Sequence, residues 1–142
     1  MVGKIIERPA IITATLGGQG QGEVRAKSGA QAVLAGLASE EGFTPVELMD
    51  AALAGCLVLS FRIAARKRGW GARLRSIAVD VIHHKASEGA SRVQGFDCCF
   101  TIDGDFSQTE RADLIAEAHA ICTVGNTLHA GAQMRDIEEI PQ

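Results

Sequence analysis

Residues 42–56 read Gly-Phe-Thr-Pro-Val-Glu-Leu-Met-Asp-Ala-Ala-Leu-Ala-Gly-Cys, and this stretch predicts the beginning of a long helix. Thr44 and Glu47 have the spacing of a capping box, in which each side chain bonds the backbone N–H of the other residue. Pro45 occupies the first helical position, where a residue without an N–H loses no helical hydrogen bond. The helix is therefore expected to run from Pro45 to about Arg68.

The same helix is apolar on nearly every side. Over residues 51–65 only Ser60 and Arg62 are polar, and cations at 66–68 precede Gly69, which favours a helix end. A helix without a polar face is one that protein surrounds. Because a chain of 142 residues has few elements to surround it, we expect a partner subunit to cover one side.

Shorter elements flank this helix and set the fold class. Alternation and capping signals predict strands at 5–16, 23–27 and 30–36, a hairpin with strands at 77–81 and 96–102, a helix opened by the capping box of Ser107 and Glu110, and a last strand at 133–140. N-terminal strands, a long buried central helix, a strand hairpin and a second helix make an α+β fold. We expect residues 1–142 to form a single domain.

The composition excludes several classes of protein. Fourteen basic and seventeen acidic residues give a net charge of −3, and without a basic cluster nucleic acid is not an expected partner. No run of about 18 uncharged apolar residues is present, so no membrane partner is expected. The N-terminus lacks the pattern of a signal peptide. We therefore expect a cytoplasmic protein whose four cysteines are reduced.

The cysteines fall into two pairs of different character. Cys98 alternates with phenylalanines on the inner face of its strand, where a free cysteine packs as a small hydrophobe, and Cys99 points to the opposite face. Cys56 and Cys122 each lie on the apolar stripe of a helix and point inward, so they can meet despite their distance in sequence. Two ordinary core cysteines remain the alternative. No set of metal ligands is evident, and we expect no metal.

Two stretches resemble the OsmC/Ohr family, the osmotically inducible and organic-hydroperoxide-resistance proteins. Residues 42–56 are similar to the family's first cysteine motif, and residues 118–128, Ala-His-Ala-Ile-Cys-Thr-Val-Gly-Asn-Thr-Leu, to its second. The order and spacing of elements match over nearly the whole chain. The resemblance implies an OsmC-like fold and an intertwined homodimer with two active sites built from both subunits. Such a dimer would also cover the apolar helix.

The resemblance further implies a cysteine-based peroxidase for small organic hydroperoxides, active in oxidative and osmotic stress defence. Cys56 would attack the peroxide, and Cys122 would resolve the resulting sulfenic acid as a disulfide. An external thiol or dithiol reductant would then reset the pair, with no cofactor. The candidate substrate-binding residues, which share a face with the first cysteine or belong to the second motif, are Met49, Leu53, Ser60 and Asn126.

The family's activating groups are missing from this chain. The best-studied members hold the thiolate with an arginine in a G-G-R turn and a glutamate directly after the helix-opening proline. Here these positions are Gln19 and Val46. Glu47, one position later, is explained by its capping role, and it brings the chain closer to a general OsmC-like branch. Arg25, on a strand after the glycine turn, is the candidate catalytic cation for Cys56, and a solvated strand residue is the alternative.

The second motif also departs from the family, and two further functions stay open. Thr123 replaces the usual proline and Gly125 the usual serine, and Thr123 and Asn126 are expected to cap the short turn after Cys122. A relative without an activating cation would be a non-enzymatic protein that binds a small apolar ligand in the dimer-interface pocket. Acyl transfer by Cys122 and His119 is the weaker possibility, because no oxyanion donors are evident.

Overall fold

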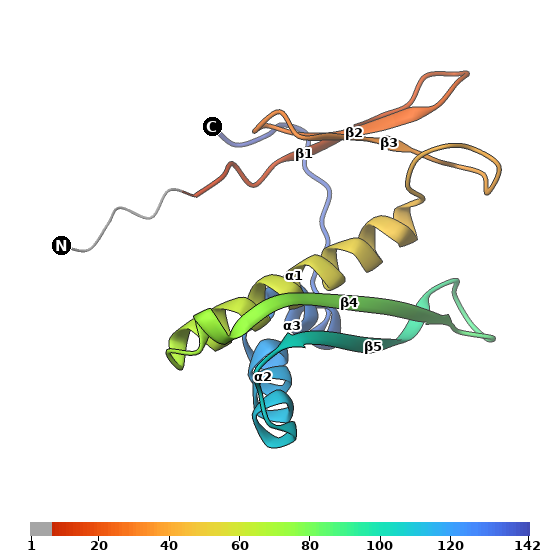
Figure 1. Cartoon of the computed structure of the whole chain (residues 1–142). Coiled ribbons are helices and arrows are strands. Elements are labelled where there is room, and N and C mark those ends of the chain that lie inside the picture. Colours follow the sequence, from red (N-terminus) through yellow and green to blue (C-terminus); the bar gives the residue numbers. More distant parts are fainter. Residues whose placement is uncertain (1–6) are drawn as a thin grey trace. The chain divides into compact units, whose positions relative to one another are not determined.

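The structure of the chain is a computed structural model that describes residues 7–142 (Figure 1). The chain forms two compact units, of which the first ends at Met49 and the second begins at Asp50. The boundary falls within helix α1, Pro45–Lys67, and each unit is described by itself. The prediction that residues 1–142 form a single domain is not tested by this division into two units.

The first unit contains a three-stranded antiparallel sheet. Its strands are β1 (Ile12–Thr15), β2 (Gly22–Ala26) and β3 (Gln31–Leu34), and β2 pairs with both neighbours. Three strands are predicted in this region, but the first is much shorter than residues 5–16, whose first two residues lie outside the described part of the chain. Pro9 falls in the part that does not pair, and a proline has no N–H to give to a strand ladder.

The second unit contains most of α1, a long hairpin and two further helices (Figure 1). The hairpin strands are β4 (Leu74–Lys85) and β5 (Val93–Gly104), and the helices are α2 (Gln108–Ile121) and α3 (Thr123–Ala130). One 3₁₀ turn, Gly71–Arg73, joins α1 to β4. The predicted order of long helix, hairpin and second helix is confirmed, as is the capping box that opens α2.

Two expectations near the C-terminus are wrong. The segment after Cys122, expected to be a short turn, forms a helix of its own, α3, which begins directly after that cysteine. The strand predicted over residues 133–140 is absent, because residues 131–142 contain neither helix nor strand. Met134 and Ile140 are exposed there. Apolar alternation does not make a strand unless a neighbouring strand satisfies its N–H and C=O groups.

Both ends of α1 form as predicted. The Thr44 hydroxyl accepts the Glu47 N–H at 3.2 Å, and the Glu47 carboxylate accepts the Thr44 N–H at 3.1 Å. At the other end the N–H groups of Gly69 and Trp70 bond carbonyls of the last turn at 3.0 and 2.8 Å, which is a Schellman motif. Gly69 has a φ of 74°, a conformation that glycine adopts without strain.

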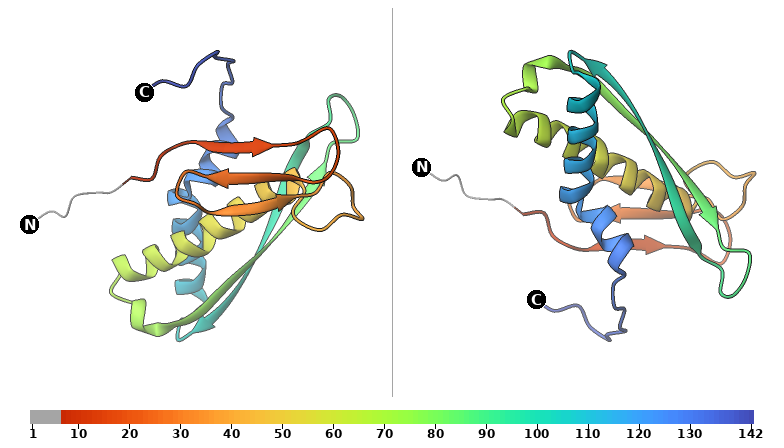
Figure 2. Two further views of the ribbon diagram at one scale, coloured as in Figure 1. Left: turned by 90° about the horizontal axis from the view of Figure 1, so that it is seen from above. Right: turned by 90° about the horizontal axis from the view of Figure 1, so that it is seen from below.

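The core of the second unit lies where α1, α2 and the hairpin meet. Phe61, Ala64 and Ala65 of α1 are fully buried against Leu114 and Ala118 of α2. Figure 2 shows α2 crossing α1 beside the two long strands. The apolar stripes predicted for the two helices therefore face one another.

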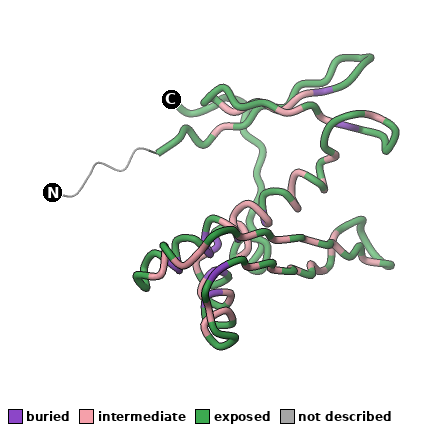
Figure 3. Tube along the Cα trace, viewed as in Figure 1, coloured by how far each residue is buried: buried purple, intermediate pink, exposed green. Residues whose placement is uncertain are grey.

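Another face of α1 stays uncovered in the single chain. Leu59 and Ile63 are 52% and 47% exposed, and exposed positions alternate with buried ones along the helix (Figure 3). By length and composition alone α1 could also cross a membrane, a criterion that the core helix of a globular protein meets as well. Phe61 and Ala64 on its other side are already covered by protein.

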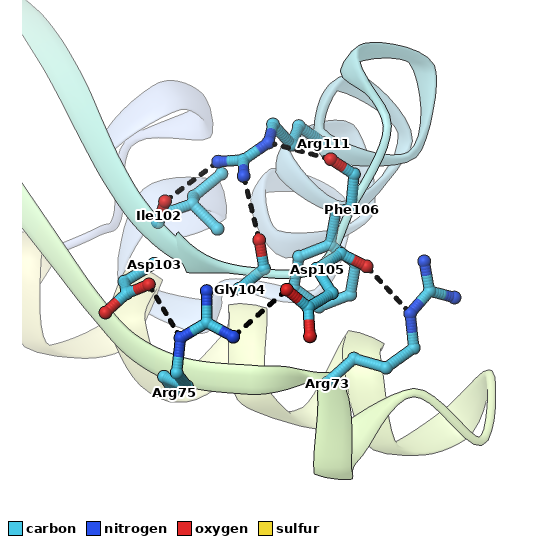
Figure 4. Close-up of polar contacts among 8 residues, drawn as sticks. All are labelled: Arg73, Arg75, Ile102, Asp103, Gly104, Asp105, Phe106 and Arg111. Atoms are coloured by element: carbon cyan, nitrogen blue, oxygen red, sulfur yellow. Dashed lines mark hydrogen bonds and ion pairs between the residues drawn. The ribbon is translucent and has the colours of Figure 1, made fainter.

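The connection from β5 to α2 is held by an arginine of α2 (Figure 4). Arg111 donates hydrogen bonds to the carbonyls of Ile102, Gly104 and Phe106 at 2.8, 3.0 and 3.2 Å. Gly104 leaves no room for a side chain, since a Cβ there would lie 2.5 Å from the Phe106 ring and 2.7 Å from the Arg73 carbonyl oxygen. These contacts fix where α2 begins, and with it the cysteine that ends this helix.

We predict that Gly69→Ala lowers the free energy of unfolding by about 1 kcal/mol, because a Cβ disfavours the left-handed conformation by roughly 1–2 kcal/mol. Urea unfolding followed by circular dichroism measures the change. Gly95→Ala is the matched control, since this glycine has no positive φ and open space around its Cβ position. An equal loss in the two variants would contradict the conformational explanation.

Candidate functional site

Two helices bring one cysteine each to the same place in the second unit. Cys56 lies in the middle of α1, and Cys122 is both the residue that ends α2 and the N-cap of α3. Leu53, Leu57 and Cys122 form a buried cluster, and Cys56 packs against it. The structure thus brings together the two cysteines that the sequence singled out.

The first turn of α3 directs its backbone N–H groups at the two sulfurs. The Gly125 N–H donates to Cys122 Sγ at 3.2 Å. The N–H groups of Thr123 and Val124 hydrogen-bond to the Cys56 sulfur. The first N–H groups of a helix have no partner within it and carry the positive end of its dipole. Two sulfurs therefore occupy the place that a capping oxygen takes in most helices.

The pKa of Cys56 is lowered from the ordinary thiol value. Burial is the largest single influence and raises the pKa, but hydrogen bonds from Cys122, the backbone of Val124, the Ser60 hydroxyl and the backbone of Thr123 together outweigh it. Donors that face a sulfur stabilise its thiolate form. Cys56 is also half-buried, whereas Cys122 is buried.

The pKa of Cys122 is raised, which sets it apart from its partner. Burial is the main cause, since the residue is 0% exposed, and the interaction with the Cys56 sulfur raises it further against the opposing Gly125 N–H. Two thiols in contact do not both ionise readily, because like charges repel. Cys56 is therefore the thiol of the pair that ionises first, and Cys122 is the one that keeps its proton to higher pH.

Ser60 supplies a side-chain donor at this site. It is 5% exposed and is the one buried polar side chain of the described residues. It lies one helical turn after Cys56, and its hydroxyl bonds the Cys56 sulfur. The sequence offers Ser60 as a substrate-binding candidate, and the structure places its hydroxyl against the reactive sulfur.

The other candidate residues lie in different surroundings. Leu53 is 4% exposed in the cysteine cluster, while Met49 is half-buried one turn earlier on α1, where the first unit ends. Arg25 belongs to the first unit, where its guanidinium pairs with Glu23 at 3.0 Å and its side chain is 57% exposed. Its expected role as the catalytic cation stays a prediction.

The capping groups predicted for the turn after Cys122 are wrong. The cap is the sulfur of Cys122 itself. The Asn126 side chain turns back and donates to the Ala120 carbonyl at 3.1 Å, which satisfies the end of α2. Cysteine is not among the residues favoured at helix N-caps, so the sequence carries little signal for this arrangement.

A cavity of about 380 Å³ adjoins the cysteine cluster within the second unit. Its lining residues come from α1, β5, α2 and α3 and include Leu53, Phe96, Cys98, Gly125 and Leu128. Gly125 links this cavity to the second cysteine. It lines the cavity, and a Cβ on it would lie 3.3 Å from Cys122 Sγ and 3.6 Å from the Leu53 side chain. No group of three metal-ligating side chains suited to an ion occurs within the described residues.

Comparison with known proteins places this site in a family. A family model described as OsmC-like protein matches residues 36–135, which include both cysteines. The chain belongs to the OsmC-like family. The resemblance of the two cysteine motifs is thereby confirmed, and no curated protein matches the chain closely enough to add to it.

Solved structures of OsmC-like proteins share the fold. An OsmC-like protein from Mycoplasma pneumoniae is 19% identical with a TM-score of 0.74, and the match covers 87% of this chain and 89% of that one. An organic hydroperoxide resistance protein from Legionella pneumophila is 25% identical with a TM-score of 0.66, over 83% and 87%. OhrB of Bacillus subtilis, another organic hydroperoxide resistance protein, is 20% identical with a TM-score of 0.65, over 84% and 89%. The predicted α+β, OsmC-like fold is confirmed.

We predict that iodoacetamide alkylates Cys56 with a pH midpoint below that of free cysteine. The sign follows from the lowered pKa: the thiolate fraction rises as pH rises through the pKa, so the midpoint moves down with it. Ser60→Ala removes one donor and is expected to move the midpoint up, which slows alkylation several-fold at neutral pH. Peptide mass spectrometry resolves the four cysteines. Ser76→Ala, at an exposed strand position, is the matched control, and an unchanged midpoint in Ser60→Ala would contradict the role of the hydroxyl.

Proposed function

We propose that this OsmC-like protein is a cysteine-based peroxidase that reduces organic hydroperoxides. The observation that carries the proposal is the contact of two thiols with opposite pKa shifts, one half-buried and lowered, the other buried and raised. Membership of the OsmC/Ohr family, with hydroperoxide resistance proteins among its structural neighbours, supports a redox protein of stress defence.

In the proposed reaction Cys56 is the nucleophile. Its thiolate attacks the terminal oxygen of the hydroperoxide, the O–O bond breaks, and Cys56 becomes a sulfenic acid while the organic part leaves as an alcohol. Cys122 then condenses with the sulfenic acid, which forms a disulfide and releases water. An external thiol or dithiol reduces the disulfide by exchange and restores both thiols. No cofactor enters this sequence.

The surroundings of the pair favour an organic substrate. Leu53 and Leu57 bury one side of the cysteine cluster, and Phe96 and Leu53 also line the neighbouring cavity. Apolar walls favour an alkyl substituent over water by about 25 cal/mol per Å² of apolar surface covered. Hydrogen peroxide has no such substituent and gains nothing from these walls.

We predict that the reduced protein consumes tert-butyl hydroperoxide far faster than free cysteine does in stopped-flow experiments. Cys56→Ser is expected to abolish consumption, because the variant lacks the proposed nucleophile. Cys122→Ser is expected to leave a sulfenic acid that dimedone traps, whereas the wild type forms a disulfide after one equivalent. Cys99→Ser, at an exposed strand position, is the control and should turn over as the wild type. A rate no higher than that of free cysteine would end the proposal.

The same site supports an alternative from another class, namely a non-enzymatic protein that binds a small apolar ligand. The cavity of about 380 Å³ favours it, because ligand pockets in proteins begin at about this size. The alternative requires Cys56 to be an ordinary thiol, whereas the donors around its sulfur lower its pKa. The peroxidase is therefore the better-supported function.

We further propose that the protein acts as a homodimer in the cytoplasm, without nucleic acid or membrane as partner. The uncovered apolar face of α1 with Leu59 and Ile63 supports the dimer. Burying such a side chain stabilises an assembly by roughly 1.5–3 kcal/mol. The net charge of −3 supports the absence of nucleic acid.

We predict that Ile63→Glu shifts the protein toward the monomer, since a carboxylate would have to lose its hydration in the interface. Light scattering after size exclusion measures the mass at several concentrations. Ala116→Glu, at an exposed position of α2, is the matched control and should leave the mass unchanged. A wild type that stays monomeric at high concentration would contradict the dimer.

A further inference from the structure

We propose that Cys122 is also the acid of the reaction, and that its thiol gives the departing alkoxide its proton when the O–O bond breaks. This role rests on the proposed peroxidase and extends it, because it gives the buried cysteine a task before the disulfide forms. It also explains how the buried Cys122 becomes a thiolate before it attacks the Cys56 sulfenic acid.

The first chemical step needs a proton donor. Attack by the Cys56 thiolate on the terminal peroxide oxygen expels an alkoxide, which is a far stronger base than a thiolate. General acid catalysis of such a departure contributes typically 10²- to 10⁴-fold in rate. A peroxidase that uses this sulfur pair therefore reacts faster with an acidic hydrogen within reach of the leaving oxygen.

The groups that bond the Cys56 sulfur leave one suitable acid among them. They are the N–H groups of Thr123 and Val124, the Ser60 hydroxyl and the Cys122 thiol. Amide and hydroxyl hydrogens donate hydrogen bonds, but these groups do not ionise near neutral pH. Of the set, a thiol alone can release its proton under these conditions.

The position of Cys122 suits the task. Its sulfur accepts the Gly125 N–H at 3.2 Å, which occupies a lone pair on the side of α3 and leaves the S–H hydrogen to point elsewhere. The Cys56 sulfur and the Val124 N–H are its other partners. The residue is 0% exposed, so its proton does not exchange directly with bulk water. Its raised pKa keeps that proton in place until a stronger base appears.

Atoms and charges balance through the two steps. A lone pair of the Cys56 thiolate bonds the terminal oxygen, the electron pair of the O–O bond goes to the alkoxide, and the alkoxide takes the proton of Cys122 and leaves as an alcohol. Cys122 is now a thiolate. It attacks the sulfur of the Cys56 sulfenic acid, the S–S bond forms, and the hydroxide that departs takes a proton from solvent to become water. Cys56 and Cys122 are oxidised together, and the hydroperoxide is reduced.

The test compares leaving groups that need a proton with leaving groups that do not. We use Cys122→Ser, because serine keeps the N-cap acceptor and nearly the size of cysteine but is too weak an acid to give up its proton. Oxidation of Cys56 in a single turnover is measured with tert-butyl hydroperoxide, which expels an alkoxide, and with peracetic acid, which expels the weakly basic acetate. Alkylation by iodoacetamide, which expels iodide, reports the nucleophilicity of Cys56 in each protein.

We expect Cys122→Ser to slow the reaction with tert-butyl hydroperoxide by about 10²-fold or more after correction for nucleophilicity, in line with the usual contribution of a general acid. The corrected rate with peracetic acid should stay close to that of the wild type. Cys122→Ala, which lacks any donor, should give the same pattern. Cys99→Ser, which changes an exposed cysteine outside the cluster, is the control and should keep both rates.

Two results would overturn the inference, and they differ from a failure of the peroxidase itself. Equal corrected losses with the two peroxides would show that Cys122 supports only the geometry or the nucleophilicity of Cys56. No loss with either peroxide would show that water supplies the proton. A wild type that reacts with neither peroxide faster than free cysteine would instead remove the proposed function, and the acid role with it.

Discussion

The site depends on one interaction, in which two sulfurs share the unpaired N–H groups at the start of α3. Burial alone would keep both cysteines protonated and unreactive. Hydrogen bonds from the Cys122 thiol, the Val124 amide, the Ser60 hydroxyl and the Thr123 amide lower the pKa of Cys56, while burial and the neighbouring sulfur raise the pKa of Cys122. The two thiols therefore differ in pKa, with the pKa of Cys56 lowered and that of Cys122 raised. The proposed chemistry follows from that asymmetry.

The rest of the second unit holds this interaction in place. α1 carries Cys56 in the middle of its 23 residues, between a capping box and a Schellman motif that define its ends. α2 carries Cys122 at its end, and Arg111 anchors the start of that helix to three carbonyls of the preceding segment. A shift of one residue in either helix would turn its cysteine by about 100° and separate the sulfurs. The caps of α1 and the Arg111 anchor of α2 therefore determine where the two sulfurs lie, although they take no part in the chemistry.

The departures from the family pattern fit this arrangement. Gln19 and Val46 stand where the best-studied relatives carry an arginine and a glutamate that hold the thiolate. The joint change is physically coherent, since a buried glutamate without its arginine would be an unpaired charge. The groups that bond Cys56 in the second unit are instead uncharged donors. Hydrogen bonds from neutral donors stabilise a thiolate less than an adjacent cation does, but they do not require the burial of a second charge.

The sequence by itself determined the long helix, the hairpin and the second helix, and it singled out Cys56 and Cys122 as candidates. Capping boxes, glycine stops and apolar periodicity are local signals, and each is written within a few neighbouring residues. Tertiary structure decided what those signals do not encode. Within the second unit, the donors at Cys56 include amides of α3, a helix that begins after a cysteine cap and that no sequence pattern predicted. The tail residues 133–140 alternate as a strand does, yet they find no strand to pair with. Both outcomes depend on contacts between segments that are far apart in the chain. The residue pattern within one segment does not specify which other segments it will contact.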